Sequence, residues 1–393
     1  MKSLIKRSNI RFVSTLLAVA LALPLSWGSI TGLYTWLSPF IMLNSVFTLK
    51  SLVWLNSLGL TVLLLSFFRR RWFCRYLCPV GWGCDKVSRI SPRKSFSLSR
   101  VPDFGGWLAL ISLAAALAGV PMFILLDPMS IFNGFFSALS GTFSVKALLL
   151  LSGLPVLLAI HLLLPGIWCK RICPLGGLQD EVSNARNLAG RLMPKTGLSV
   201  NSKDYNTGRR YFIASGIGVI SGLAISRVSF SVPENYFRPP GSVPRDLFNT
   251  LCIRCGNCIK TCPTNIIIHN TRLTHPAGLM TPEVTFANHR YCLEDCNLCS
   301  KVCSSGAITL FDIGAKSQLK MGTAIIHPEN CLLTRFEECD GCHAICSYKA
   351  IDFIRLDSGI QMIPVANADK CTGCGACAAI CPTETIDMIP LVS

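Results

Sequence analysis

Long apolar runs alternate with short, mostly basic segments over the first 230 residues of the chain. Each run approaches the roughly 20 residues that cross a hydrocarbon core about 30 Å thick. The runs are residues 10–28, 51–68, 104–126, 146–168 and 211–229. The last one is rich in Gly and Ser, so a surface-lying or cleaved segment competes with a membrane span there. The pattern predicts an α-helical membrane domain with a duplicated two-helix unit plus a fifth helix.

Charge divides the chain in the same place. Residues 1–230 hold 24 Lys and Arg against 6 Asp and Glu, whereas residues 231–393 hold 13 against 15. The basic residues concentrate in segments 69–103 and 166–210, between the apolar runs. Because basic loops stay on the cytoplasmic side, this predicts a cytoplasmic N-terminus and a C-terminal part outside the cytoplasm. It also disfavours nucleic acid as a partner, since the charge follows the loops.

Sixteen cysteines form four consecutive quartets in the C-terminal part. The first to fourth quartets are Cys252, Cys255, Cys258 and Cys262; Cys292, Cys296, Cys299 and Cys303; Cys331, Cys339, Cys342 and Cys346; and Cys371, Cys374, Cys377 and Cys381. The first and fourth have bacterial ferredoxin spacing, in which three thiolates bind one 4Fe-4S cluster and the fourth reaches a neighbouring cluster. Gly256, Gly373 and Gly375 suit a backbone that bends closely around a cluster. Residues 232–393 are therefore expected to form an α+β polyferredoxin domain of ferredoxin-like repeats with four clusters.

Other uses of these cysteines fit the spacing less well. Disulfides are disfavoured because the thiols are too close in sequence to pair sensibly, and zinc because the groups recur as ferredoxin quartets. The segment Cys339-Asp340-Gly341-Cys342-His343 matches a c-type haem attachment site. Haem there would leave Cys331 and Cys346 without partners, so no haem is expected.

The irregular spacing of the two middle quartets suggests which quartets share clusters. The regular, proline-ended quartets are first and last, which favours a nested exchange of the fourth cysteines. The predicted groups are Cys252, Cys255 and Cys258 with Cys381; Cys371, Cys374 and Cys377 with Cys262; Cys292, Cys296 and Cys299 with Cys346; and Cys331, Cys339 and Cys342 with Cys303.

The tail from Arg238-Pro239-Pro240-Gly241 to Cys381-Pro382 resembles the NapG/MauM-type periplasmic ferredoxins. The resemblance implies four clusters, twin-arginine export and electron transfer near a periplasmic reductase. Residues 199–231 fit export, because Thr207 to Ile213 is similar to a twin-arginine signal. A positive-inside flank would also account for Arg209 and Arg210.

The apolar half contains an internal repeat. Cys74-x3-Cys78-Pro recurs as Cys169-x3-Cys173-Pro, 95 residues further on. These four residues, the fifth cysteine set, are candidates for a fifth 4Fe-4S cluster, and partner-docking or redox-inactive thiols are the alternative. Cys84 corresponds to Gln179 in the second copy, so the repeat gives no reason to assign Cys84 as a ligand.

Residues 1–198 resemble the NapH-type membrane partner of those ferredoxins, a four-helix protein with the same paired motifs. The resemblance implies a role in quinol oxidation. One departure is that residues 175–210 contain no cysteine, whereas that family carries a two-cluster ferredoxin tail there. The sequence thus resembles a fusion of a NapH-type protein with a NapG/MauM-type ferredoxin.

These features predict a membrane-anchored iron–sulfur protein of a bacterial or archaeal cytoplasmic membrane. It would contact lipid and the quinone pool and pass electrons from quinol to a periplasmic reductase or electron-transfer subunit. A conduit from a cytoplasmic donor and a maturation or regulatory factor for a periplasmic metalloenzyme are the alternatives. His161 and Asp127 are candidates for a quinone site, as a hydrogen-bonding group and a proton acceptor, while helix packing is the competing role for His161.

Overall fold

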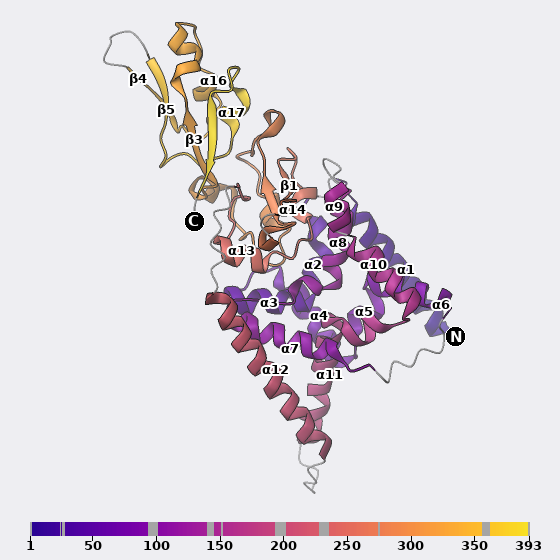
Figure 1. Cartoon of the computed structure of the whole chain (residues 1–393). Coiled ribbons are helices and arrows are strands. Elements are labelled where there is room, and N and C mark those ends of the chain that lie inside the picture. The colour runs from indigo at the N-terminus through magenta and orange to yellow at the C-terminus, as the bar shows by residue number, and fades with distance from the viewer. Residues whose placement is uncertain are drawn as a thin grey trace.

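The computed structural model describes two parts of the chain, one helical and one rich in cysteine (Figure 1). The residues that it describes are 2–23, 25, 28–92, 101–139, 145–150, 152–192, 202–227, 236–273, 276–355 and 362–391. The helical part is residues 2–227, and the cysteine-rich part is residues 236–391. The predicted domain boundaries at 198/199 and 231/232 lie outside the described residues.

The helical part contains α-helices joined by tight turns. They are α1 (Lys2–Ala22), α2 (Leu33–Trp36), α3 (Pro39–Leu49), α4 (Asn56–Phe68), α5 (Trp72–Tyr76), α6 (Pro79–Ile90), α7 (Phe104–Leu117), α8 (Pro128–Ser137), α9 (Val145–Leu150), α10 (Gly153–Leu163), α11 (Pro174–Leu192) and α12 (Ser202–Arg227), with the short helical turns η1 (Gly28–Gly32), η3 (Ile124–Leu126) and η4 (Trp168–Ile172, a π-helix). Phe40, Phe73 and Leu175 are fully buried in its core. Figure 1 shows α12 alongside α7 at the end of the molecule away from the sheets.

The prediction of a membrane domain is wrong. No helix within the described ranges is both long enough and apolar enough to cross a membrane. The apolar runs are broken into shorter helices: α4 has 13 residues and is about 20 Å long, against a hydrocarbon core of about 30 Å. The run 104–126 ends its helix at Leu117, and Gly119 beyond it has a φ of +91°. The two longest helices, α1 and α12, each contain several Lys and Arg residues.

The two copies of the repeat begin their helices in the same way. Pro39 and Pro128 are the first residues of α3 and α8, where the missing proline N–H costs nothing. Ser38 and Asp127 cap these helices by accepting backbone N–H groups. Ser38 Oγ also donates to Asp127 Oδ2 at 2.6 Å, so the two helix starts are joined in the core.

The cysteine-rich part consists of short helices and three two-stranded antiparallel sheets. Its elements are α13 (Arg245–Leu251), α14 (Asn257–Lys260), α15 (Leu298–Lys301), α16 (Gly341–Ala344), α17 (Ala376–Ile380), β1 (Ile267–His269), β2 (Pro282–Val284), β3 (Gly322–Ile326), β4 (Ile351–Arg355), β5 (Met362–Ala366), β6 (Ile386–Pro390) and the 3-10 turns η5 (Pro276–Gly278), η6 (Ala287–His289), η7 (Ile313–Gln318), η8 (Pro328–Asn330) and η9 (Leu332–Arg335). β1 pairs with β2, β3 with β6 and β4 with β5. The predicted ferredoxin-type repeats are thus present.

The first cysteine loop packs directly against the helical part. Ile253, next to Cys252, lies in a small core with Ile41 and Ile124. Ser130 Oγ at the start of α8 donates to the Ile253 carbonyl oxygen. Figure 1 shows α14, which follows this loop, close to the helical part. The first cysteine loop is therefore one of the contacts that dock the cysteine-rich part on the helical part, together with the bond from Trp36 Nε1 to the Lys301 carbonyl oxygen.

A buried lysine reinforces this interface. Lys260 is only 7% exposed, and its Nζ donates to Ala22 O and to Asn133 Oδ1, both at 3.3 Å. Burial lowers the pKa of Lys260 to about 8, against the opposing effect of Cys255 and Cys258. An ammonium group in such a place needs these acceptors to offset its desolvation.

Candidate iron–sulfur centres

The first three cysteines of the first quartet surround a cavity together with a cysteine of the second quartet. The thiols that line this cavity are Cys252, Cys255, Cys258 and Cys303. Burial raises the pKa of Cys255 to about 12, and Cys303 adds to the rise, although the Asn257 backbone N–H opposes it. Because a metal ligand must be a thiolate, Cys255 has to lose its proton when a cation binds there. Four thiols around one buried cavity fit a 4Fe-4S cluster.

The rest of the second quartet gathers with the fourth cysteine of the first. Burial raises the pKa of the Cys299 thiol, and Cys292, Cys296 and Cys262 raise it further, whereas Lys316 lowers it. Lys316 Nζ donates to the carbonyl oxygen of Cys296 at 2.6 Å. These four thiols therefore lie near one another, and the Lys316 ammonium lies beside Cys296.

The third and fourth quartets exchange cysteines in the same manner. One cavity is lined by Cys371, Cys374, Cys377 and Cys346. A second cavity is lined by Cys331, Cys339, Cys342 and Cys381. The short helices also pack in pairs: α16 packs against α17, just as α14 packs against α15.

The nested exchange predicted from the irregular spacing is wrong. Cys303 lies with the first quartet and Cys381 with the third, so each quartet exchanges its fourth cysteine with its neighbour in sequence. The physical reason is local: consecutive quartets place their short helices against each other, which closes two clusters within one ferredoxin-type unit. Proline-ended spacing identifies a cluster motif but carries no information on its partner.

The fifth cysteine set also comes together. All four of its thiols line a single cavity of about 180 Å³ in the helical part: Cys74, Cys78, Cys169 and Cys173. Cys78 and Cys173 are N-caps of α6 and α11, and their sulfur atoms accept the backbone N–H groups of Gly81 and Gly176 at 3.2 and 3.4 Å. Burial raises the pKa of both thiols, and the two N–H donors at the helix N-termini oppose that rise. Four thiols that become thiolates when iron binds fit a 4Fe-4S cluster.

Basic side chains surround this cavity. Arg7, Arg11, Arg71, Arg75 and Lys170 line it, with Asp85 the acidic residue among its lining. The carboxylate of Asp180 holds Arg71 at 2.6 Å and also pairs with Arg70 at 2.7 Å. Burial opposes ionisation of Asp180, yet both arginines lower its pKa overall. Positive charge beside four thiolates stabilises the negative charge that a cluster brings.

Comparisons with known proteins agree with these centres. A 4Fe-4S dicluster domain matches residues 337–385, a 4Fe-4S binding domain matches residues 51–96 and 147–191, and a further 4Fe-4S binding domain matches residues 247–268. The ferredoxin-type protein NapG of Escherichia coli K12 is 30% identical over 196 residues, which are 45% of this chain and 82% of that protein. The methylamine utilization ferredoxin-type protein MauM of Methylorubrum extorquens is 30% identical over 171 residues, 41% of this chain and 76% of that protein. The chain belongs to the NapG/MauM family of ferredoxin-type proteins.

Membership of the NapG/MauM family makes the chain an iron–sulfur electron-transfer protein of the ferredoxin type. The ferredoxin-type protein NapF of Haemophilus influenzae is also similar, with 33% identity over 185 residues, 47% of this chain and 94% of that protein. No solved structure matches the chain. The predicted fusion with a NapH-type membrane protein is not supported, because the described helices are too short or too polar to span a membrane.

The haem-like motif is accounted for by the third quartet of this NapG/MauM protein. Cys339 and Cys342 line one cavity with Cys331 and Cys381, a four-thiol set that suits a cluster. The ring of His343, which follows them, lies beside the Phe353 ring, with the centroids 5.2 Å apart and the planes tilted by 37°.

The two residues proposed for a quinone site have defined places. His161 is fully buried on α10, and its Nδ1 lies 3.1 Å from the Leu157 carbonyl oxygen. Asp127 is fully buried between the two repeats, where it accepts from Ser38 and from the Met129 backbone N–H at 2.8 Å. Burial raises the pKa of the nearby Cys173 thiol, and the Asp127 carboxylate adds to that rise. Whether either residue contacts a quinone stays a prediction.

Asp127 provides a pH-dependent prediction for this NapG/MauM protein. Burial raises the pKa of Asp127 to about 6, against the lowering effect of its hydrogen bonds from Ser38 and the α8 backbone. The folded state therefore holds this proton more tightly than the unfolded state, so stability falls as the pH rises from about 4 to about 6. The loss approaches about 3 kcal/mol for two pKa units.

Asp127→Asn keeps an oxygen acceptor and removes the titration. We expect its thermal midpoint, measured by circular dichroism from pH 4.5 to 7.5, to rise relative to the natural sequence as the pH increases. Two midpoints that stay parallel over this range would contradict the assignment.

Proposed function

We propose that this protein carries five 4Fe-4S clusters in a continuous series and relays electrons between a donor at the helical part and a reductase or electron-transfer subunit at the cysteine-rich part. The observation that carries the proposal is the docking of the first cysteine loop on the helix that borders the fifth cysteine set. Pro128, the first residue of α8, lines the cavity of that set. Ser130, two residues later, bonds the loop of the first quartet. The two sites thus flank a single helical turn.

The same continuity extends through the cysteine-rich part. Helix α14, which contains Cys258, packs against α15, which contains Cys299, and this contact sets the groups of the first and second quartets side by side. The Cys292 backbone N–H donates to the Cys374 carbonyl oxygen at 2.9 Å, which joins the second quartet to the fourth. The clusters of the series would then lie in this order: the fifth set first, followed by the groups led by the first, second, fourth and third quartets.

This order places the fifth set next to the first quartet. With the fifth set on one side of a membrane and the quartets on the other, about 30 Å of hydrocarbon would separate them. In the folded chain the start of α8 contacts both sites, because Pro128 lines the cavity of the fifth set and Ser130 bonds the loop of the first quartet. Electron transfer along the series then needs no additional cofactor at that step.

The donor enters, in this proposal, at the basic cavity of the fifth set. Its rim of Arg7, Arg75 and Lys170 favours an anionic donor surface or head group. Quinol as the donor, export from the cytoplasm and a periplasmic reductase as the acceptor complete the proposal, since the resemblance to the NapH-type and NapG/MauM-type proteins implies them.

Iron content tests the number of clusters. The anaerobically purified full chain should contain about twenty iron atoms and a matching amount of acid-labile sulfide, because each cluster holds four of each. Replacing Cys78 and Cys173 together by Ala should lower the content to about sixteen, since only the fifth set loses ligands. About sixteen in the natural sequence would contradict the fifth cluster.

Reduction by a donor tests the relay. Dithionite should reduce all clusters of the natural chain, and stopped-flow absorbance should show whether menaquinol or ubiquinol reduces them as well. In the Cys78→Ala/Cys173→Ala variant, reduction by the productive donor should be lost while reduction by dithionite remains. A variant that the same donor reduces at the natural rate would exclude the fifth set as the entry point.

A further inference from the structure

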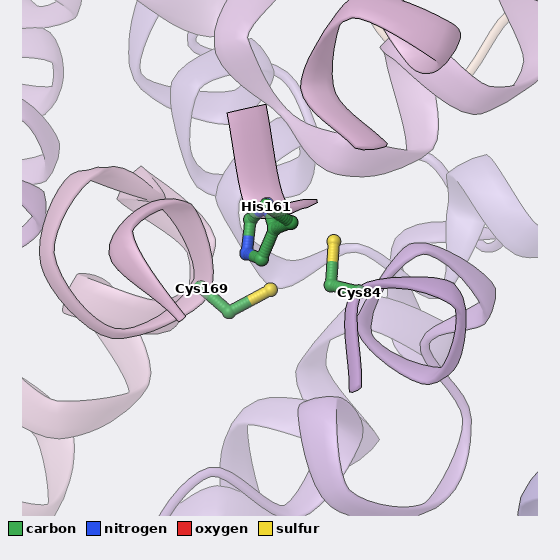
Figure 2. A group of neighbouring side chains, drawn as sticks. All are labelled: Cys84, His161 and Cys169. Carbon is green, nitrogen blue, oxygen red and sulfur yellow. The ribbon is translucent and has the colours of Figure 1, made fainter. Parts of the chain in front are cut away.

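Three ligand-type side chains meet beside the fifth cysteine set, and two of them have no part in the centres described so far. They are Cys84 on α6, His161 on α10 and Cys169 in η4 (Figure 2). Their ligand atoms all lie within 4.8 Å of one another. Cys84 is 1% exposed and His161 is 0% exposed, so solvent does not reach either.

The internal repeat shows what is unusual about Cys84. Its counterpart in the second copy is Gln179, 95 residues further on. Gln179 Nε2 donates to Cys74 Sγ at 3.2 Å, and Cys84 lies against Cys169. Each of these residues therefore touches the first cysteine of the opposite copy. One copy offers an amide, which is a hydrogen-bond donor, and the other offers a thiol, which is an iron ligand.

The imidazole of His161 is oriented as in metal-binding histidines. Its Nδ1 faces the Leu157 carbonyl oxygen at 3.1 Å, which assigns the ring proton to Nδ1. Nε2 then carries the lone pair, and it has no oxygen or nitrogen partner among the described residues. Figure 2 shows the ring beside the sulfur atoms of Cys84 and Cys169. Histidine ligands to metals usually donate their other ring N–H to a backbone carbonyl in this way.

We propose that Cys84 and His161 form a second ligand position for the iron atom that Cys169 binds in the fifth cluster. The inference rests on the proposed fifth cluster. It gives one iron atom of that cluster, the one at Cys169, alternative protein ligands. When Cys84 replaces Cys169, the proton of the Cys84 thiol passes to the departing Cys169 thiolate, so the net charge of the site does not change, whereas neutral His161 binds through its existing lone pair. The iron atom at Cys74 gains no such alternative ligand from its neighbour Gln179, because an amide does not bind iron at a cluster.

The symmetric pair Cys169→Ala and Cys74→Ala tests this difference. Both full-length variants would be purified anaerobically, with iron, sulfide and the EPR spectrum of the reduced protein measured beside the natural sequence. We expect Cys169→Ala to keep about twenty iron atoms, with altered g-values for one cluster, and Cys74→Ala to fall to about sixteen. The signals of the remaining clusters report in both variants that the chain has folded.

The triple variant Cys84→Ala/His161→Leu/Cys169→Ala identifies the source of any rescue. It should fall to about sixteen iron atoms. A triple variant that keeps the fifth cluster would overturn the proposal, since a solvent ligand would then suffice. The proposal also fails if Cys169→Ala loses the cluster as Cys74→Ala does, while the fifth cluster itself still stands. A natural chain with about sixteen iron atoms would instead refute the fifth cluster.

Discussion

Replacing Cys303 by Ala should abolish the cluster held by Cys252, Cys255 and Cys258, although Cys303 belongs to a different quartet. The structure places Cys303 in the cavity of the first quartet, where it supplies the fourth thiol. When a cluster loses one thiolate, one of its iron atoms has no ligand and the buried cavity is no longer matched to the cluster. We therefore expect the cluster to be lost completely, not merely to give a weaker signal. The cluster bound by Cys292, Cys296, Cys299 and Cys262 should remain.

Cys381→Ala is the matched control for this prediction. It removes the corresponding fourth cysteine of the fourth quartet, which lines the cavity with Cys331, Cys339 and Cys342. Both variants should lose about four iron atoms per chain, but from different clusters, which Mössbauer or EPR redox titration distinguishes by their midpoint potentials. If Cys381→Ala, and not Cys303→Ala, removed the signal that Cys255→Ala removes, the exchange between neighbouring quartets would be refuted.

Gly177→Ala should unfold the region around the fifth cysteine set. A Cβ atom on Gly177 of α11 would overlap the backbone of Gly105 and Gly106 at the start of α7. Backbone atoms cannot rotate away as a side chain can, so α7 and α11 would have to separate. We expect a loss of about 3 kcal/mol or more in the free energy of unfolding. The fifth cluster should be lost as well, because Cys173 lies one turn before Gly177.

Gly216→Ala provides the control within the same helical part. Gly216 lies inside α12, and a Cβ atom there meets nothing within 4 Å. Alanine favours helix by about 1 kcal/mol relative to glycine, so this variant should be as stable as the natural chain or more stable. Thermal unfolding and the iron content of the two variants give the comparison. Equal stability of both would show that α7 and α11 do not pack through Gly177.

The cluster motifs could be predicted from sequence because their chemistry is local. Gly256 and Gly375 have φ angles of +65° and +82°, so the tight loops expected beside Cys255 and Cys374 are present. The fifth set was also predictable, since Cys74 and Cys169 stand at equivalent places in a repeat and the fold brings both copies to one cavity.

The membrane prediction failed because mean apolar character does not reveal where a helix stops. The run 104–126 contains Gly119 and Pro121 after the end of α7, and the run 146–168 is divided between α9 and α10. The role of Cys84 was also hidden from the sequence. Its counterpart Gln179 differs in type, and only the contacts of both residues with the opposite copy show that they are equivalent.

Exchange between neighbouring quartets also determines when each cluster can form during synthesis. Cys252 and Cys303, which share a cavity, are separated by about fifty residues, so the first ferredoxin-type unit is complete before the third quartet has left the ribosome. In a nested exchange the cluster at Cys252 could form only after Cys381 had been made. The loop between these two residues is more than twice as long, so its closure costs more conformational entropy. The observed arrangement therefore lets the cysteine-rich part load iron in two successive stages, and the thiols of the first unit are bound before those of the second are made.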